Sequence, residues 1–345
     1  MEGKKMRAII MPQHGGRETL RFVSDFPDPV PGRGEVLVKV AATGINNVDL
    51  VNRRGYPGIT IPLPHILGSD ITGTVEAIGD GVSGVEPAER VIVYPLIGCG
   101  ACSSCSDSQP NICVNWKFIG LHLNGGYGEY VSVPEENIVP LQIPFEDAVS
   151  IPVAGLTAYH GLKTVGGLKP GQIFFIWGGS GGLGTMAIQI AKHLGATVIA
   201  TGSTQKKLDV MKKLGADHVL NRLHDDVPGE VKKIAPNGVD LVLDYVGPAT
   251  FAISFGMLRK GGTMLLCGII TGRETNFSIH QTYLRHLSIK GLYMGTKPEM
   301  IELLDLVARK KIKPYIGERF DLKEASEGHR LMEAGESIGK IVLKV

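Results

Sequence analysis

Four of the chain's five cysteines fall within a 15-residue window, at Cys99, Cys102, Cys105 and Cys113. This C-x2-C-x2-C-x7-C spacing is typical of a tetrahedral four-thiolate zinc site, because short turns let all four sulfurs converge on one ion. Four protein ligands leave no coordination position open for a substrate. The sequence therefore predicts one structural Zn²⁺ per chain, held in a lobe at about residues 95–115 that we call the cysteine lobe.

The composition excludes several classes of protein. The net charge is +2, 43% of the residues are apolar, and no basic stripe with interleaved aromatic residues indicates a nucleic-acid partner. No apolar run reaches the roughly 18 residues needed to span a membrane, and the start of the chain does not resemble a signal peptide. We therefore expect a cytoplasmic protein with no membrane partner. In a reducing compartment clustered cysteines favour metal binding over disulfides, with hyperthermophile proteins as the exception.

At 345 residues the chain is long enough for two domains. Up to about residue 152 it reads as short strands broken by glycine and proline, which predicts a β-rich domain. Strands then alternate with helical stretches, which predicts βαβ units and a parallel sheet. The last stretch predicts two helices and a final strand that returns to the first domain. The expected α/β organisation is thus 1–153, 154–293 and 294–345.

A glycine-rich turn follows the apolar stretch QIFFIW and leads into the amphipathic stretch TMAIQIAKHLG. Glycines at such a turn allow the backbone to approach a pyrophosphate, which then binds the free N–H groups at the helix N-terminus. The strand before and the helix after favour a dinucleotide site over a flexible loop. The predicted contacts are Gly179, Gly181, Gly182, Leu183 and Gly184.

The second predicted strand ends without the acidic residue that usually binds the ribose 2′-hydroxyl of NAD. Gly202 stands there, and hydroxyls and cations follow it at Ser203, Thr204, Lys207 and Arg222. Such side chains suit a 2′-phosphate, so NADP(H) is expected over NAD(H). The alternative is that Lys207 and its neighbouring lysines only solvate a helix face.

Several segments in this order resemble the medium-chain dehydrogenase/reductase superfamily, which includes zinc alcohol dehydrogenases and quinone oxidoreductases. They are GEVLVKVAATGIN, ILGSDITGTVEAIG, the cysteine lobe, IPVAGLTAYHGL, GGSGGLG and the closing GKIVLKV. The resemblance covers nearly the whole chain. It implies a GroES-like catalytic domain made from both chain ends, a Rossmann coenzyme domain between them, and a substrate cleft where they meet. It also implies a dimer or tetramer, the structural zinc of the cysteine lobe, and Thr157 against the nicotinamide.

The resemblance also locates the positions where alcohol dehydrogenases hold a catalytic zinc. In this chain they carry Asn46, Ser69 and Val153, none of which is a good zinc ligand. An alternative site from His65, Asp49 and Asp70 is less favoured, because such residues commonly make turn and ion-pair contacts. The proton relay of the alcohol dehydrogenases is also missing, since its two positions hold Val48 and Val51.

These departures predict a reductase that works without a catalytic metal. We expect hydride transfer from NADPH to activated or bulky ketones, quinones or enones, with Asn46 facing the substrate oxygen and Tyr56 as a second donor. Asn46 could instead only form a turn, and Tyr56 could only pack. A conventional alcohol dehydrogenase with an unrecognised zinc, and a non-catalytic NADPH-binding protein, remain the alternatives.

Overall fold

The computed structural model describes residues 4–56 and 58–345, which form two compact units. The first unit comprises residues 1–154, 296–309 and 314–345, and the second comprises 155–295 and 310–313. Most of the C-terminal segment, 296–309 and 314–345, thus lies in the first unit, and 310–313 lies in the second.

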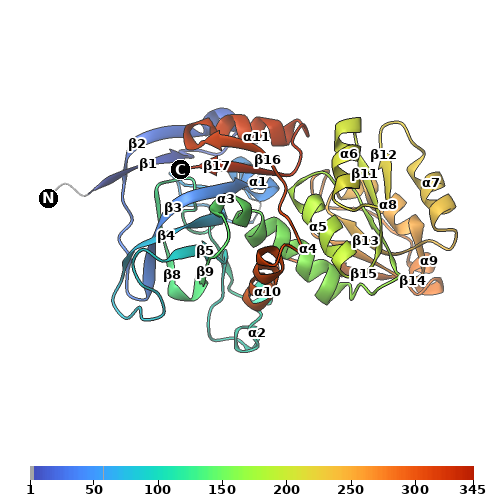
Figure 1. The fold of residues 1–345 in the computed structure, drawn as a ribbon, viewed down its shortest axis with the longest axis horizontal. Coiled ribbons are helices and arrows are strands. Elements are labelled where there is room, and N and C mark those ends of the chain that lie inside the picture. Colours follow the sequence, from blue (N-terminus) through green and yellow to red (C-terminus); the bar gives the residue numbers. More distant parts are fainter. Residues whose placement is uncertain (1–3, 57) are drawn as a thin grey trace. The chain divides into compact units, whose positions relative to one another are not determined.

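The first unit is built on a seven-stranded sheet in the order β16-β17-β3-β4-β5-β9, with β8 paired to β3 (Figure 1). The central strand shows why the sequence forms a sheet here: Val36, Val38 and Val40 alternate inward and are buried, while Lys39 between them is exposed. The strands of this unit are β1 Lys5–Ile10, β2 Arg21–Pro27, β3 Glu35–Ile45, β4 Asp70–Ile78, β5 Arg90–Val93, β6 Leu96–Ile97, β7 Lys117–Phe118, β8 Tyr130–Pro134, β9 Ile138–Pro140, β16 Ile316–Asp321 and β17 Lys340–Lys344.

Short helices connect these strands. They are α1 Asn47–Arg54, α2 Ser103–Ser106, α3 Phe145–Ala148, α10 Lys297–Ala308 and α11 Ala325–Glu333. The two helices and final strand expected near the C-terminus are α10, α11 and β17, and strand β16 between the helices was not expected. Because β17 pairs antiparallel with β3, the chain's last residues lie beside residues 42–45.

The second unit is a six-stranded sheet whose described pairs are parallel, in the order β12-β11-β10-β13-β14-β15. All six strands expected from the sequence are present, as β10 Ile173–Ile176, β11 Thr197–Gly202, β12 His218–Asn221, β13 Val239–Asp244, β14 Leu258–Leu266 and β15 Ser288–Gly291. The helices are α4 Leu156–Tyr159, α5 Gly182–His193, α6 Gln205–Lys213, α7 Val227–Ile234, α8 Pro248–Met257 and α9 Ile279–Leu284. This is the Rossmann-type arrangement expected for the central segment.

Helix α5 buries the face that its apolar spacing predicts. Met186, Ala187, Ile190 and Ala191 are fully buried, whereas Leu194, expected on the same face, is half-buried at the helix end. In the described part of the chain, no helix is long and apolar enough to cross a membrane.

Candidate functional site

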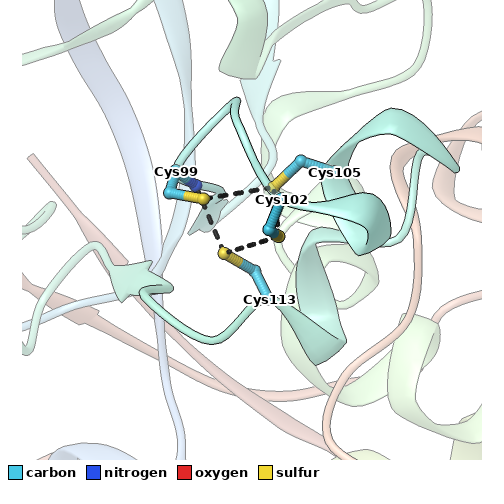
Figure 2. Close-up of side chains that lie close together, drawn as sticks. All are labelled: Cys99, Cys102, Cys105 and Cys113. Carbon is cyan, nitrogen blue, oxygen red and sulfur yellow. Dashed lines mark hydrogen bonds between the residues drawn. The ribbon is translucent and has the colours of Figure 1, made fainter.

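The four clustered cysteines turn their sulfur atoms toward one another (Figure 2). Their sulfur atoms all lie within 4.8 Å of one another. The Sγ–Sγ distances include 3.6 Å between Cys102 and Cys105 and 3.7 Å between Cys102 and Cys113. Sulfurs bound to a tetrahedral zinc ion at about 2.3 Å would lie about 3.8 Å apart. The cysteine lobe therefore has the spacing of a four-thiolate zinc site.

The environment of these thiols also suits a cation. The backbone N–H groups of Cys99 and Asn115 donate to Cys113 Sγ at 3.3 and 3.4 Å. A hydrogen bond from the backbone of Cys105 lowers the pKa of Cys102 to about 6, whereas burial raises the pKa of Cys105 to about 11. With one pKa below and one above the usual thiol range, the four thiols do not all ionise together at neutral pH, whereas a bound zinc would stabilise all four thiolates.

The predicted dinucleotide turn lies between β10 and α5. Gly178 has a φ of +58°, and the backbone N–H of Gly179 donates to Thr201 O at 2.9 Å. A Cβ on Gly184 would lie 2.6 Å from the Cα of Gly179, so only glycine allows the turn to pack this closely against the start of the helix. Gly181 is the N-cap of α5, and Gly182, Leu183 and Gly184 form its first turn. The structure thus brings all five predicted residues to one helix N-terminus.

The residues predicted to discriminate the coenzyme gather at the end of β11. Thr204 caps α6, and Lys207 Nζ lies 3.5 Å from Ser203 Oγ. The last residues of β11 and β12, Gly202 and Asn221, are paired, which brings Arg222 beside Gly202: its backbone N–H donates to Gly202 O at 2.9 Å. Two basic residues and two hydroxyl-bearing residues therefore lie at or next to the strand end that lacks a carboxylate.

Thr157 lies in α4, in the same unit as the glycine turn. Its side chain is nearly buried, and its hydroxyl lies 3.7 Å from the sulfur of Met294. This contact still leaves the hydroxyl oxygen able to accept a hydrogen bond.

The three positions that hold a catalytic zinc in alcohol dehydrogenases are in the first unit. Asn46 is the N-cap of α1, and its backbone N–H donates to the carboxylate of Asp49 at 2.7 Å. Ser69 is fully buried, and its Oγ has no hydrogen-bond partner among the described residues. Val153 uses its backbone N–H to donate to Asp70 Oδ1 at 2.9 Å.

Lys340, at the start of β17, occupies this region with a positive charge. Its Nζ donates to Asn46 Oδ1 at 2.7 Å and also forms an ion pair with Asp70 Oδ2. Asn46 Nδ2 donates to the same Asp70 oxygen at 2.6 Å. We call Asn46, Asp70 and Lys340 the lysine cluster.

A catalytic zinc does not fit these residues. Zinc requires thiolate, imidazole or carboxylate ligands, and an amide, a hydroxyl and an isopropyl group do not replace them. Of the two nearby carboxylates, Asp49 accepts the backbone N–H groups of Asn46 and Gly68. Asp70 is paired with the Lys340 ammonium group, which would repel a second cation. Among the described residues, only the four cysteines form a group of metal-ligating side chains, so the alternative set of His65, Asp49 and Asp70 is not brought together.

Two titratable groups near this region have perturbed pKa values. Burial lowers the pKa of His65 to about 4, so its ring is neutral at physiological pH. Burial raises the pKa of Asp49 to about 7, against the opposing effect of the N–H groups of Asn46 and Gly68. The half-buried Tyr56, the second predicted donor, follows the end of α1.

Sequence reasoning missed Lys340. The signal was present, because a lysine precedes the apolar run Ile341–Leu343 of the final strand, in a chain that lacks good ligands at the catalytic zinc positions. Asp70 was considered as an ion-pair residue, but its partner lies 270 positions away in sequence and could not be identified.

Comparison with known proteins identifies the family. Residues 32–143 match the alcohol dehydrogenase GroES-like domain, and residues 182–309 match the zinc-binding dehydrogenase family. An NAD-dependent alcohol dehydrogenase from Sulfolobus acidocaldarius is 33% identical, covering 99% of this chain and 100% of that protein. An acryloyl-coenzyme A reductase from Sulfurisphaera tokodaii is 31% identical, covering 98% of this chain and 100% of its own.

Solved structures agree with these matches. A crystal structure of an NAD-dependent alcohol dehydrogenase superposes with a TM-score of 0.93 at 38% identity, covering 99% of this chain and 100% of that one. The fold is therefore matched by relatives that span the whole chain. The chain belongs to the medium-chain dehydrogenase/reductase superfamily and is an NAD(P)-dependent oxidoreductase.

Proposed function

We propose that this protein is an NADPH-dependent reductase of activated carbonyls, or of double bonds conjugated to a carbonyl, that works without a catalytic metal. The observation that carries the proposal is the lysine cluster: the residues at the catalytic zinc positions are not ligands, and an internal ammonium group lies among them. The cysteine lobe would hold the one structural zinc. Bulky apolar ketones, quinones and enones are the substrates we expect.

Energetics favour reduction over alcohol oxidation. A zinc ion can lower the pKa of bound water from about 15.7 to about 7, which at about 1.4 kcal/mol per pKa unit amounts to about 12 kcal/mol of oxyanion stabilisation. One hydrogen-bond donor contributes about 3 to 4 kcal/mol. Ethanol-like substrates should therefore react poorly.

The bound nicotinamide supplies the hydride, and this chain's residues bind and orient the reactants. Asn46 would donate a hydrogen bond to the substrate oxygen, with Tyr56 as a second donor, and the charge formed on an enolate is delocalised and needs no more than this. The relative named acryloyl-coenzyme A reductase supports the conjugated-substrate class. Thr157 would contact the nicotinamide.

A preference for NADPH is supported by the end of β11. Ser203, Thr204, Lys207 and Arg222 provide the hydroxyls and cations that a 2′-phosphate requires, and Gly202 provides no carboxylate for a 2′-hydroxyl. Arg222→Ala should weaken NADPH binding about tenfold and leave NADH binding unchanged, because one charge-assisted contact is worth about 1.5 kcal/mol. Lys212→Ala, at an exposed position of α6, the helix that carries Lys207, is the control. Tighter binding of NADH than NADPH by the wild type would refute the preference.

The function itself is tested by metal analysis combined with a substrate panel. We expect one zinc per chain and NADPH oxidation with quinones, enones and aryl ketones, with ethanol turned over at least 1,000-fold more slowly. The missing oxyanion stabilisation, roughly 8 kcal/mol, exceeds the about 4 kcal/mol that a 1,000-fold difference requires. The alcohol dehydrogenase relatives favour a second candidate, a conventional dehydrogenase. Two zinc ions per chain with rapid alcohol oxidation would establish that candidate, whereas tight NADPH binding without any turnover would indicate a non-catalytic protein.

The cytoplasmic location and a homodimeric or homotetrameric assembly are part of the same proposal. The family resemblance supports the assembly, and light scattering of the purified protein measures it directly. A monomeric mass would contradict it.

A further inference from the structure

The lysine cluster joins three segments that are distant in sequence. Asn46 precedes α1, Asp70 opens β4 and Lys340 opens β17. Asp70 and Lys340 are 0% and 2% exposed, and Asn46 is 8% exposed. Asn46 is thus the most accessible member of a small, charge-neutral network.

The charges of the network fix the orientation of the Asn46 amide. An ammonium group can only donate hydrogen bonds, so the amide atom facing Lys340 Nζ at 2.7 Å must be the oxygen. An ionised carboxylate can only accept, so the atom facing Asp70 Oδ2 at 2.6 Å must be the nitrogen. A flipped amide would place donor against donor and acceptor against acceptor. One N–H of Nδ2 is then left over, and it is always a donor.

We infer that Lys340 and Asp70 are positioning residues that make Asn46 an obligatory hydrogen-bond donor to the substrate oxygen. This inference rests on the proposed function and deepens it. Lys340 also polarises the amide, because a carbonyl oxygen that accepts from a cation leaves its own N–H groups more positive. The internal cation therefore acts on the substrate through Asn46 rather than by direct contact.

The backbone near the cluster is shaped for the lysine side chain. A Cβ on Gly44 of β3 would lie 2.4 Å from Lys340 Cε and 2.9 Å from Asp70 Oδ2. The glycine therefore makes room for the ammonium group and its partner. Gly44→Ala gives a way to displace Lys340 without removing any charge.

The test compares Asn46→Ala with the charge-free double variant Asp70→Asn/Lys340→Met, alone and combined. Removing both charges avoids leaving a buried carboxylate unpaired, so the double variant should fold. Asn46→Ala and the double variant should each lower kcat for enone reduction about 100-fold, which is the typical effect of losing one oxyanion donor. The KM for NADPH should be unchanged in both. The combined variant should lose no more than Asn46→Ala alone, because both changes remove the same interaction. Gly44→Ala should lower kcat in the same way.

The matched control is Lys344→Met, which removes the other lysine of β17. Lys344 is exposed and pairs with Glu146 at 3.1 Å, so its loss should leave kcat unchanged. If the double variant keeps wild-type kcat, or if its loss multiplies with that of Asn46→Ala, the inference is wrong.

A second measurement does not depend on turnover. In the NADP-bound protein with ¹⁵N-labelled asparagine, the Asn46 side-chain N–H that faces Asp70 should exchange slowly with solvent, and Asp70→Asn/Lys340→Met should accelerate that exchange at least tenfold. If the wild type reduces nothing in the panel, the proposed function falls, and this exchange decides the positioning claim by itself. Equal exchange in the two proteins would refute it.

Discussion

The cysteine lobe and the lysine cluster lie in the same unit, and they neutralise the negative charge of their side chains in different ways. Each brings polar side chains into close contact, from one segment in the lobe and from three in the cluster. Sulfur–sulfur distances in the lobe include 3.6 and 4.0 Å, and hydrogen bonds in the cluster measure 2.6 and 2.7 Å. The lobe gathers potential negative charge and needs a cation from solution. The cluster carries its cation covalently, on Lys340.

This difference separates structural from functional dependence on zinc. Closed four-thiolate coordination can stabilise the loop between Cys99 and Cys113 but offers no position to a substrate. By the family resemblance, the lysine cluster includes one of the positions at which alcohol dehydrogenases hold a catalytic zinc, Asn46, and the charges of Asp70 and Lys340 balance each other. Stability should therefore depend on added metal, whereas the chemistry should not.

The strongest way to test the comparison is to remove a ligand from the lobe. Cys113→Ser should abolish zinc binding, because structural zinc sites are worth about 10 kcal/mol or more and depend on all four ligands. The thermal midpoint should fall by about 10 °C or more, as a loss of several kcal/mol implies for a chain of this size. Zinc content by mass spectrometry and calorimetry of the same samples measure both effects.

Cys267→Ser provides the control for the lobe. Burial raises the pKa of Cys267 to about 12, so this thiol is protonated and not a ligand. Zinc content should be unchanged. Retention of one zinc by Cys113→Ser would contradict the assignment.

The next largest effect is expected when only one of the two charges of the lysine cluster is removed. Lys340→Met leaves the fully buried Asp70 carboxylate without its cation, which typically costs about 3 to 5 kcal/mol. Asp70→Asn/Lys340→Met should recover most of that stability, because no charge is left unpaired. Urea unfolding of both variants measures the difference, and equal stability would show that the ion pair is not the basis of the cluster. Unlike Cys113→Ser, both variants should retain one zinc.

Sequence alone could predict much of this molecule because its signals are local. The alternating valines of β3, the glycine turn before α5 and the spacing of four cysteines each lie within 15 residues of chain or fewer. The six strands of the second unit and the convergence of the cysteines were therefore predicted and are observed.

The lysine cluster could not be predicted because its information is not local. Asn46, Asp70 and Lys340 meet only after β3, β4 and β17 have paired, and nothing in the spacing of the three residues reveals that pairing. From sequence, Asn46 was a turn residue or a donor; in the fold it is a helix cap whose side-chain orientation is fixed by two charges. The sequence shows that Asn46, Ser69 and Val153 are not good zinc ligands, but it does not reveal that Lys340 contacts Asn46.

The smallest of the expected effects is a difference in how low pH destabilises the cysteine lobe and the lysine cluster. Protons displace zinc from thiolates, whereas the lysine cluster binds no metal for protons to displace. His329 also makes the stability of the protein depend on pH, and its contribution must be separated from that of the lobe. It is fully buried, with Nε2 3.1 Å from the hydroxyl of Tyr127 and Nδ1 3.0 Å from Nη1 of Arg53. Burial, with Arg53 nearby, lowers the pKa of His329 from 6.5 to about 3.

The direction in which His329 changes stability with pH follows from proton uptake. Between pH 6.5 and 3 the unfolded chain protonates this histidine and the folded protein does not, so stability falls as pH decreases in that range. At pH 5 the loss should be about 2 kcal/mol relative to pH 7.5. Urea unfolding at both pH values measures it, with His329→Gln as the variant in which this part of the slope disappears. His65 adds a second part of the same sign, because burial lowers its pKa to about 4. The acid sensitivity that remains in His65→Gln/His329→Gln should follow zinc release, measured with a colorimetric chelator. It should be absent when Cys113→Ser is added to these two changes; if it persists there, acid acts on the fold outside the cysteine lobe.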